Sequence, residues 1–600
     1  MSTRTNEPLQ NRIAHLWQAK SRQLSGERRF HLTLDKRDLM ILLLLTCAAS
    51  FLIFWRLGEG SLGDYDEADY AQSAREMLWL SDFNTPRWNG MEFFDKPPTC
   101  QWLTALAYKV FGVNEFSARL VSACSGVLAI LLTYILGRDL FGRRAIGLGA
   151  AIILLTVSRN LFSHGYNFLS LARVGMLDMP LILSMMAAVW LAWRASSSAP
   201  EQRGRYFLWL GVPLGLGLKI KSIAGFMDYG IVVLYLVLGV PRSVWWRKEA
   251  LGGLLLSALL AAPWHLGQLL IWGRHFWNSY VVSLTVGYVT GEQGHTKDWL
   301  FYFRSMQRGF PTWYPLVAVA VLYGLYRSLL YLRSTWARRG TEVSTSVRQT
   351  EDRGIMLLLC WAAVPMILYN ASRSRIGWYM IPIYPALALL AMYLLVSVLG
   401  SRTTKPLIRP VASVLIRWLP GAWDVEDINR PGSALLAVFL VLVLTLALNP
   451  WLPRVNDFNP DVKKVVLYSN YVVDQDDVLV NYWPGSYWIR PSALFYANRP
   501  LLLVIEEQAL RRLLGTEGSF YALAEREHWE PLAELGDVVY RSGEYVLVKA
   551  HSFLSPDREQ APLLRDGVPN SASARKWRGS AGHGTSHLMP TTGTLQKREG

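Results

Sequence analysis

The stretch Leu39–Trp55 reads LMILLLLTCAASFLIFW and contains no charged residue. Inside a bilayer every backbone amide must be satisfied within its own segment, so about 20 mostly apolar residues in a row form a helix that crosses the membrane. Of the 600 residues, 52% are hydrophobic and 18% are charged, and the apolar residues gather in blocks such as Ala434–Leu448. The sequence therefore predicts an α-helical protein that crosses a membrane many times.

Blocks of this kind predict about 11 membrane-spanning helices. The number of spans ranges up to about 13, because the block at Ala145–Val157 is short for a span and the stretch at Pro406–Leu419 could dip into the membrane. The predicted spans are Leu39–Trp55, Leu120–Gly137, Ala145–Val157, Met179–Trp193, Tyr206–Ile220, Ile223–Val240, Leu251–Trp272, Trp313–Leu332, Ile355–Tyr369, Tyr379–Leu399 and Ala434–Leu448.

The positions of the charges orient the spans. The formal net charge of +16 comes from 61 Lys and Arg against 45 Asp and Glu. The basic residues cluster in short links such as Gly142–Arg144 and Trp246–Lys248, which is typical of cytoplasmic loops and argues against nucleic acid as the partner. We therefore predict a multi-pass protein of the cytoplasmic (inner) membrane, with its amino terminus inside and its carboxyl-terminal domain outside.

Four segments follow from this topology. After Pro450 short β-type runs such as Val478–Tyr482, Leu501–Ile505 and Tyr545–Val548 replace the long apolar blocks, with a helical stretch at Glu506–Leu514. The end of the chain is rich in Ser, Gly, Thr and Pro, a composition that disfavours a packed core. The predicted segments are a cytoplasmic start (1–38), a transmembrane domain (39–449) with outer loops 58–119 and 273–312, a small extracytoplasmic α/β domain (450–550) and a disordered tail (551–600).

Acidic residues crowd the first outer loop, where Asp66 and Glu67 stand close to the end of the first span. Any single acid at such a place is about as often a solvated loop charge as a functional group. The sequence Lys96-Pro97-Pro98 is more informative, because two prolines fix the backbone and hold Asp95 and Lys96 in place. A fixed acid beside a fixed base is a candidate ligand site.

Other polar residues lie on the same predicted face. Asp178 stands at the outer start of a span, where a carboxylate is costly and marks a functional site or a buried pair. Lys221, Arg375 and Tyr379 lie at the outer ends of later spans; snorkelling explains any one of these cations as well as function does. His295 is one of the histidines nearest this face, so a divalent cation at Asp95 and His295 is an alternative, with no cofactor or metal assigned.

These residues, in this order, resemble the bacterial aminoarabinose transferases (ArnT) and their relatives among the GT-C glycosyltransferases, including the dolichyl-phosphate-mannose protein mannosyltransferases. The resemblance covers roughly Leu39–Leu399 and is densest between Asp64 and Arg119. The motifs that carry it are Asp66-Glu67, Tyr70-Ala71-Gln72, Ala74-Arg75-Glu76-Met77, Asn89-Gly90, Phe93-Phe94-Asp95-Lys96-Pro97-Pro98, Asn114–Leu120, Leu177-Asp178-Met179-Pro180, Pro263-Trp264, Gly294-His295 and Ser372–Arg375 with Tyr379.

The resemblance implies a GT-C fold and an inverting sugar transfer from a polyprenyl-phosphate carrier. By motif match Asp66, with Glu67 beside it, and Asp178 take the catalytic positions, and Lys96 belongs to the same site. Tyr70 falls within the same motifs. The chain departs from the family pattern at Asp69, Phe93, Asp95, Ser222 and Asp298, so the resemblance leaves the sugar and the acceptor open.

The reaction expected of this site is displacement at an anomeric carbon. Asp66 would accept the proton of an acceptor hydroxyl and Asp178 would orient the reactants. Lys96, with Lys221, Arg375 and Tyr379, would bind the phosphate of the donor, whose negative charge increases as it leaves.

The acceptor is expected to be a glycolipid such as lipid A or another cell-envelope glycan. Two alternatives stay open: an enzyme like the protein O-mannosyltransferases that acts on Ser or Thr, and a transporter or flippase of lipid-linked sugars.

Overall fold

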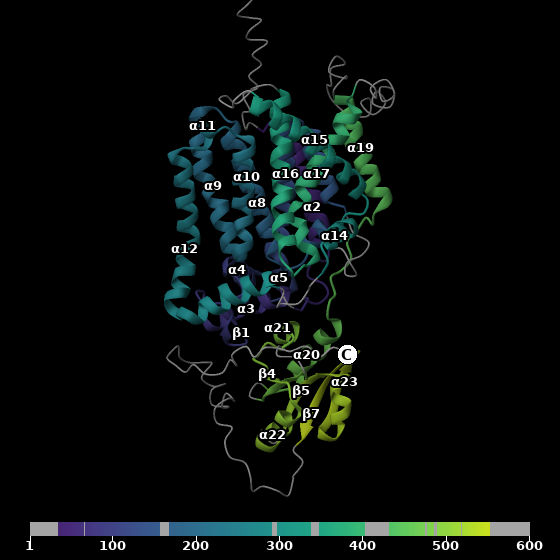
Figure 1. Cartoon of the computed structure of the whole chain (residues 1–600). Coiled ribbons are helices and arrows are strands. Elements are labelled where there is room, and N and C mark those ends of the chain that lie inside the picture. The colour runs from purple at the N-terminus through teal and green to yellow at the C-terminus, as the bar shows by residue number, and fades with distance from the viewer. Residues whose placement is uncertain are drawn as a thin grey trace, which may run out of the picture. The chain divides into compact units, whose positions relative to one another are not determined.

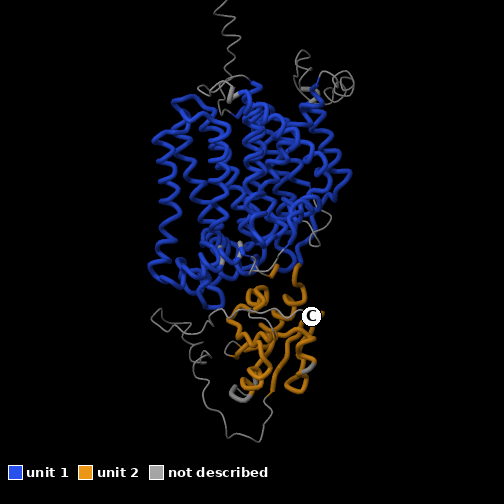
Figure 2. The backbone as a smooth tube through the Cα atoms, in the orientation of Figure 1, with its two compact units in different colours: residues 1–62, 66–457 blue, residues 63–65, 458–600 orange. Residues whose placement is uncertain are grey.

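The computed structural model describes residues 34–64, 66–156, 167–290, 297–337, 347–401, 431–474, 477–484, 489–517 and 519–551. It divides into two compact units, which are coloured separately in Figure 2. The larger unit comprises Met1–Leu62 and Asp66–Asp457, and the smaller comprises Gly63–Tyr65 and Phe458–Gly600. The predicted dip at Pro406–Leu419, the histidine His295, and most of the predicted amino-terminal segment and tail lie outside the described residues.

Every predicted span coincides with a helix of the larger unit. Eight described helical segments are long and apolar enough to cross a membrane, and one of them, Pro200–Gly239, contains two of the predicted spans. Two shorter apolar helices, Arg144–Leu154 and Ala434–Leu448, match the two remaining ranges. The polytopic helical fold is therefore confirmed. The helices are α2 (Lys36–Phe54), α5 (Glu115–Phe141), α6 (Arg144–Leu154), α8 (Asp178–Ser197), α9 (Pro200–Lys221), α10 (Phe226–Gly239), α12 (Lys248–Phe276), α15 (Tyr314–Ala337), α16 (Val347–Ala371), α17 (Tyr384–Leu399) and α19 (Pro431–Leu448).

Glycines bring several of these helices close together. In Figure 1 the helices α8, α9 and α12 run side by side, and α9 packs against both neighbours. A Cβ atom on Gly211 of α9 would lie 2.0 Å from the carbonyl oxygen of Gly253 of α12. The short helix α6 packs between α5 and α17 in the same way. Small residues favour such contacts in membranes, where lipid gives helices no hydrophobic reason to associate.

Gly147→Ala is expected to destabilise the larger unit. A Cβ on Gly147 of α6 would lie 2.2 Å from the carbonyl oxygen of Tyr134 in α5, so the helices must separate. Overpacking of this kind costs about 1–3 kcal/mol, and a thermal-unfolding midpoint of the protein in detergent measures it. Gly267→Ala in α12 is the matched control, since its Cβ would meet no atom within 4 Å. Equal midpoints for the two variants would contradict this packing.

The predicted outer loop 58–119 is itself largely ordered into short elements. Between α2 and α5 the chain forms α3 (Asp66–Leu80), a small hairpin of β1 (Arg87–Trp88) and β2 (Met91–Glu92), and α4 (Thr99–Phe111). Two further elements of the larger unit bear on the site: α14 (Phe301–Gly309) and the 3-10 helix η3 (Gly377–Ile383).

The smaller unit is an α/β domain, as the sequence predicts. Its strands stand in the order β4-β3-β5-β7-β6; β3 is parallel to β4 and β5, whereas β7 is antiparallel to β5 and β6. Residues such as Val480, Leu510 and Val548 form its core. The sequence did not predict β5 and β6. The elements are α20 (Pro460–Val472), β3 (Leu479–Tyr482), α21 (Pro491–Ala497), β4 (Leu502–Val504), α22 (Glu507–Glu517), β5 (Ser519–Glu525), α23 (Arg526–Trp529), η5 (Glu530–Leu535), β6 (Gly536–Ser542) and β7 (Tyr545–His551).

Candidate functional site

Asp66 is the first residue of α3 and is partly exposed. Burial, the largest effect, raises the pKa of its carboxyl to about 6. Lys221 and Lys96 favour the charged form, whereas the carboxylates of Asp95 and Asp178 oppose it. We call Asp66 and the four charged residues that act on it the Asp66 cluster. A carboxyl with a pKa near 6 is ionised at neutral pH yet basic enough to accept a proton in a reaction.

Lys96 is already paired with the carboxylate next to it in the chain. Its Nζ lies 2.7 Å from Oδ1 of Asp95, and the hydroxyl of Tyr70 donates to Oδ2 of Asp95 over 2.9 Å. Pro97 and Pro98 follow directly, and α4 begins after them. Tyr70 lies one helical turn after Asp66 on α3, so this helix holds both the acid and the donor that fixes Asp95.

The second ion pair joins the ends of two helices. Nζ of Lys221, the last residue of α9, lies 2.6 Å from Oδ2 of Asp178, the first residue of α8, and both side chains are buried. Lys221 also lies 5.4 Å from the centre of the Tyr379 ring in η3, and Tyr379 stacks on Tyr369 of α16 at 4.6 Å. An ion pair buried this deeply is costly to form, and its geometry depends on all four elements.

Glu67 contacts a different set of groups from Asp66. Its Oε1 accepts from Nε of Arg119 at 2.8 Å and from the backbone N–H of Gly175 at 2.9 Å. The Arg119 guanidinium donates further to the carbonyl oxygens of Leu57 and Ser61. Both charged side chains are almost fully buried. Glu67 thus ties the start of α3 to α5 and to the loop before Asp178, an arrangement that positions other residues.

Glu76 connects two of the sequence motifs, its own and the Asn89-Gly90 pair. Its carboxylate accepts from the backbone N–H groups of Asn89 and Gly90 at 2.6 and 2.9 Å. Both residues have positive φ angles, 50° and 83°, which suits the two-residue turn between β1 and β2. Sequence reasoning did not assign Glu76, although the Asn-Gly pair was a signal for the turn. The contact fixes the hairpin that leads to Asp95.

An aromatic cluster packs around Phe94, the residue before Asp95. Phe94 packs edge-on against Trp272 and Phe276 of α12, with ring centres 5.9 and 5.2 Å apart. Tyr280 stacks on Phe276 at 4.8 Å, and its hydroxyl lies 2.8 Å from Nε2 of His265. These large side chains hold the Asp95–Lys96 segment against the membrane helices, a contribution that motif matching did not reveal.

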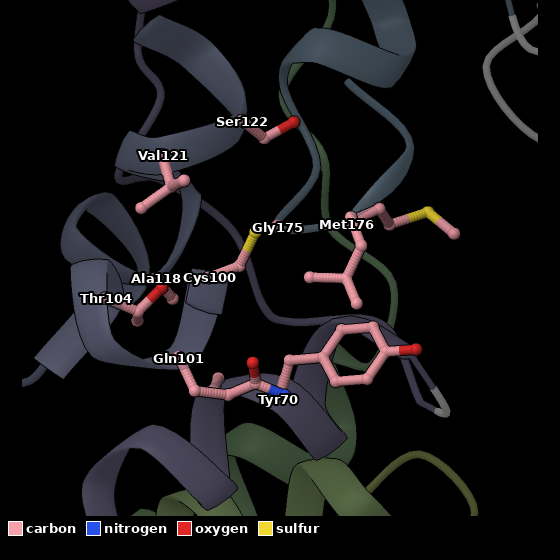
Figure 3. Close-up of a pocket in the computed structure, with 11 residues that line it drawn as sticks. Tyr70, Cys100, Gln101, Thr104, Ala118, Val121, Ser122, Gly175 and Met176 are labelled. Atoms are coloured by element: carbon pink, nitrogen blue, oxygen red, sulfur yellow. The ribbon is translucent and has the colours of Figure 1, made fainter. Parts of the chain in front are cut away.

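A small cavity lies behind Tyr70, between α3, α4, α5 and the loop before Asp178 (Figure 3). It has about the size of one water molecule. Gln101 and Ser122 line it, and neither polar atom of the Gln101 amide has a hydrogen-bond partner among the described residues. The cavity is too small for a sugar.

The remaining predicted site residues lie apart from these pairs. Arg375 donates to the backbone carbonyls of Asn370, over 2.8 Å, and of Lys297. The predicted alternative is a divalent cation bound by Asp95 and His295. His295 is outside the described residues, so Asp95 is the one described ligand of that site. Tyr70 and Lys96 already bind the two oxygens of Asp95, so this carboxylate is poorly suited to act as a metal ligand.

The sequence of this chain matches known families. The family described as dolichyl-phosphate-mannose-protein mannosyltransferase matches residues 95–266. An undecaprenyl phosphate-alpha-4-amino-4-deoxy-L-arabinose arabinosyl transferase from Pseudomonas aeruginosa is 29% identical over 378 residues, 60% of each chain. An uncharacterized protein of Aquifex aeolicus is 26% identical over 350 residues, 58% of this chain and 62% of that protein. The match thus spans about three fifths of the length of these relatives.

Solved structures agree with the sequence matches. ArnT from Cupriavidus metallidurans, solved with undecaprenyl phosphate bound, superposes with a TM-score of 0.60 at 17% sequence identity, over 87% of this chain and 99% of that one. The apo state of the same protein also gives 0.60, over 85% of this chain. These comparisons confirm the predicted resemblance, the GT-C fold and the multi-pass membrane architecture. The orientation of the termini and the identity of the membrane stay predictions.

Proposed function

We propose that this chain, whose fold is that of the ArnT-like GT-C glycosyltransferases, transfers a sugar from a polyprenyl-phosphate donor to an acceptor at the outer face of the cytoplasmic membrane. The observation that supports this most is the cluster around Asp66, which combines a carboxyl of raised pKa with the two lysines Lys96 and Lys221. The relatives named as arabinosyl transferases, and the ArnT structure with bound undecaprenyl phosphate, support the class of donor.

The proposed reaction is an inverting displacement at the anomeric carbon. Asp66 takes the proton of the acceptor hydroxyl while its oxygen forms the new glycosidic bond. The bond between the anomeric carbon and the phosphate oxygen breaks, and the electron pair leaves with the polyprenyl phosphate. Lys96 and Lys221 stabilise that growing negative charge in a partly buried setting, where ion pairing is strong. Asp178 orients Lys221 and the sugar.

We propose that donor binding rearranges the two ion pairs. Each lysine is matched by a carboxylate 2.6–2.7 Å away, so the phosphate meets more positive charge when Asp95 or Asp178 gives way. Asp95 keeps a second partner in the Tyr70 hydroxyl when it releases Lys96. We therefore propose that Lys96 is the first lysine to exchange its carboxylate for the donor phosphate. Lys221 is buried with its Nζ over the Tyr379 ring, and it stabilises the negative charge of the leaving group later in the reaction.

Two acceptor classes are proposed. The first is a glycolipid such as lipid A or another cell-envelope glycan, which the motif resemblance to the aminoarabinose transferases implies; the names of the relatives give the donor and not the acceptor. The match of residues 95–266 to the mannosyltransferase family favours a Ser or Thr hydroxyl of a protein instead. Both acceptors offer a neutral hydroxyl, which is the group that needs a base such as Asp66.

Mass spectrometry of envelope lipids and of glycoproteins, from cells with and without the gene, distinguishes the two acceptors. A sugar lost from a lipid in the deletion strain identifies a glycolipid acceptor, and one lost from peptides identifies protein glycosylation. Restoring the gene as wild type, but not as Asp66→Asn, is expected to return the modification. Identical lipids and glycopeptides in all strains would contradict the proposed transfer.

A further inference from the structure

A second cavity lies at one end of the helix bundle of the larger unit. It has a volume of about 260 Å³, and its walls come from the ends of α6, α14 and α19, the link into α15 and the short helix α7 (Phe168–Ala172). In Figure 1, α14 and α19 lie on the right of the bundle, whereas α9, which carries Lys221, lies on the left. The described residues that line the cavity include no member of the Asp66 cluster. It is therefore separate from the proposed donor site.

The walls of this cavity suit an apolar guest. Apolar side chains from α6, α7 and α19 form part of them: Ile153, Leu154, Phe168 and Leu448. Polar side chains of the wall bond to one another. The Trp313 indole N–H donates to the Thr156 hydroxyl at 3.0 Å, and the Thr312 hydroxyl donates to Oδ1 of Asn449 at 3.1 Å. Because these groups already have partners, the wall offers water few hydrogen bonds and favours a hydrocarbon chain.

Arg308 is the one charged residue among the described residues that line the cavity. It lies in the last turn of α14, is exposed, and forms no hydrogen bond or ion pair with a described residue. Arg304, one turn earlier on the same helix, is instead paired with Asp298. A guanidinium binds a phosphate well, because two of its parallel N–H groups can donate to two phosphate oxygens. The apolar walls and this cation together match an amphipathic anion.

We propose that this cavity binds a phospholipid of the surrounding bilayer, with an acyl chain inside the cavity and the phosphate on Arg308. The helices α6 and α19 end beside the cavity and α15 begins there, and the ends of spanning helices lie at the level of the lipid headgroups. One cation matches the single negative charge of a phosphodiester such as phosphatidylglycerol. The donor phosphate is assigned to Lys96 and Lys221, so a bilayer lipid is the occupant that fits here. This site is additional to the proposed transferase site and does not depend on it.

Thermal unfolding of the delipidated full-length protein, in a detergent without phosphate, tests the role of Arg308. Phosphatidylglycerol is expected to raise the unfolding midpoint, since a ligand that binds the folded state stabilises it. Arg308→Gln should weaken the apparent affinity about 10- to 100-fold, because hydrogen bonds between charged groups are lost. Arg304→Gln, on the same helix but not at the cavity, is the matched control and should titrate like wild type. Diacylglycerol with the same chains, or inorganic phosphate alone, should raise the midpoint less. Equal titrations of wild type and Arg308→Gln would overturn the inference.

Trp313 reports whether the acyl chain enters the cavity. This side chain is buried and lines the cavity, so the fluorescence that wild type has and Trp313→Phe lacks arises there. Phosphatidylglycerol brominated on its acyl chains is expected to quench that difference signal, and excess unbrominated phosphatidylglycerol should restore it. No quenching of the Trp313 signal would overturn the inference. If polyprenyl phosphate restores the signal as well as phosphatidylglycerol does, the assignment to a bilayer lipid is wrong. Neither measurement involves sugar transfer, so the proposed function can fail without affecting this result.

Discussion

Asp66→Asn is expected to lower the rate of sugar transfer by about 100-fold to 10,000-fold, the usual loss when a general base is removed. The amide keeps the shape of the side chain but accepts no proton. Donor affinity should not fall, because the lysines that meet the phosphate are intact and one neighbouring negative charge is removed. Single-turnover transfer measures the rate, and equilibrium binding of polyprenyl phosphate measures the affinity.

Glu92→Gln is the matched control for this substitution. Glu92 is another carboxylate of the same segment, but it pairs with Arg87, 3.0 Å away, outside the Asp66 cluster. Its loss should leave the rate near wild type. A folded Asp66→Asn protein that transfers sugar at the wild-type rate would rule out Asp66 as the base and would point to Asp178 or to an anionic acceptor.

The raised pKa of Asp66 gives the same prediction a pH dependence. The base must be ionised, so activity is present above its pKa of about 6 and is lost as the pH falls through that value. A bound phosphate adds negative charge beside Asp66 and raises its pKa further. The acidic limb of kcat, which reports the bound enzyme, should therefore lie at higher pH than that of kcat/KM.

Lys96→Ala is expected to weaken binding of polyprenyl phosphate by about 10- to 100-fold and to lower turnover as well, because a hydrogen bond to a charged group is lost. The partner Asp95 is then left with the Tyr70 hydroxyl alone, and its unpaired charge repels the phosphate further. Asp95→Asn should do the opposite, since it frees Lys96 from an ion pair of 2.7 Å and raises the affinity for the anion.

A second lysine, on the helix that follows Lys96, provides the control. Lys109 of α4 is exposed, lies over the Phe83 ring and is outside the cluster, so Lys109→Ala should leave binding unchanged. If Lys96→Ala binds polyprenyl phosphate as well as wild type does, or if Asp95→Asn binds it more weakly, the exchange of Asp95 for phosphate at Lys96 is wrong.

The membrane fold could be predicted from sequence because apolar blocks and basic links are local signals. Even the short helix α6, Arg144–Leu154, coincides with a predicted span. The same is true of the rigid Lys96-Pro97-Pro98 segment, whose prolines act on their immediate neighbours. In the smaller unit, strand-like runs predicted β3, β4 and β7, but not β5 or β6.

The contacts that assemble the site depend on pairs far apart in sequence. Glu67 meets Arg119 and Asp178 meets Lys221, and no periodicity links such residues. Motif order placed Glu67 beside Asp66 as a catalytic candidate, while its buried partners suit a positioning role. The contact of Asp64 with Ser492 joins residues 428 positions apart and had no sequence signal at all.

Release of polyprenyl phosphate tests the central claim most directly. Purified protein in lipid is incubated with an envelope acceptor fraction and a set of polyprenyl-phosphate sugars that carry a radiolabelled lipid. For at least one donor we expect free polyprenyl phosphate to appear in step with glycosylated acceptor, one for one, and not with Asp66→Asn. Release that is equal in wild type and Asp66→Asn, or acceptor glycosylation without any release, would contradict the account.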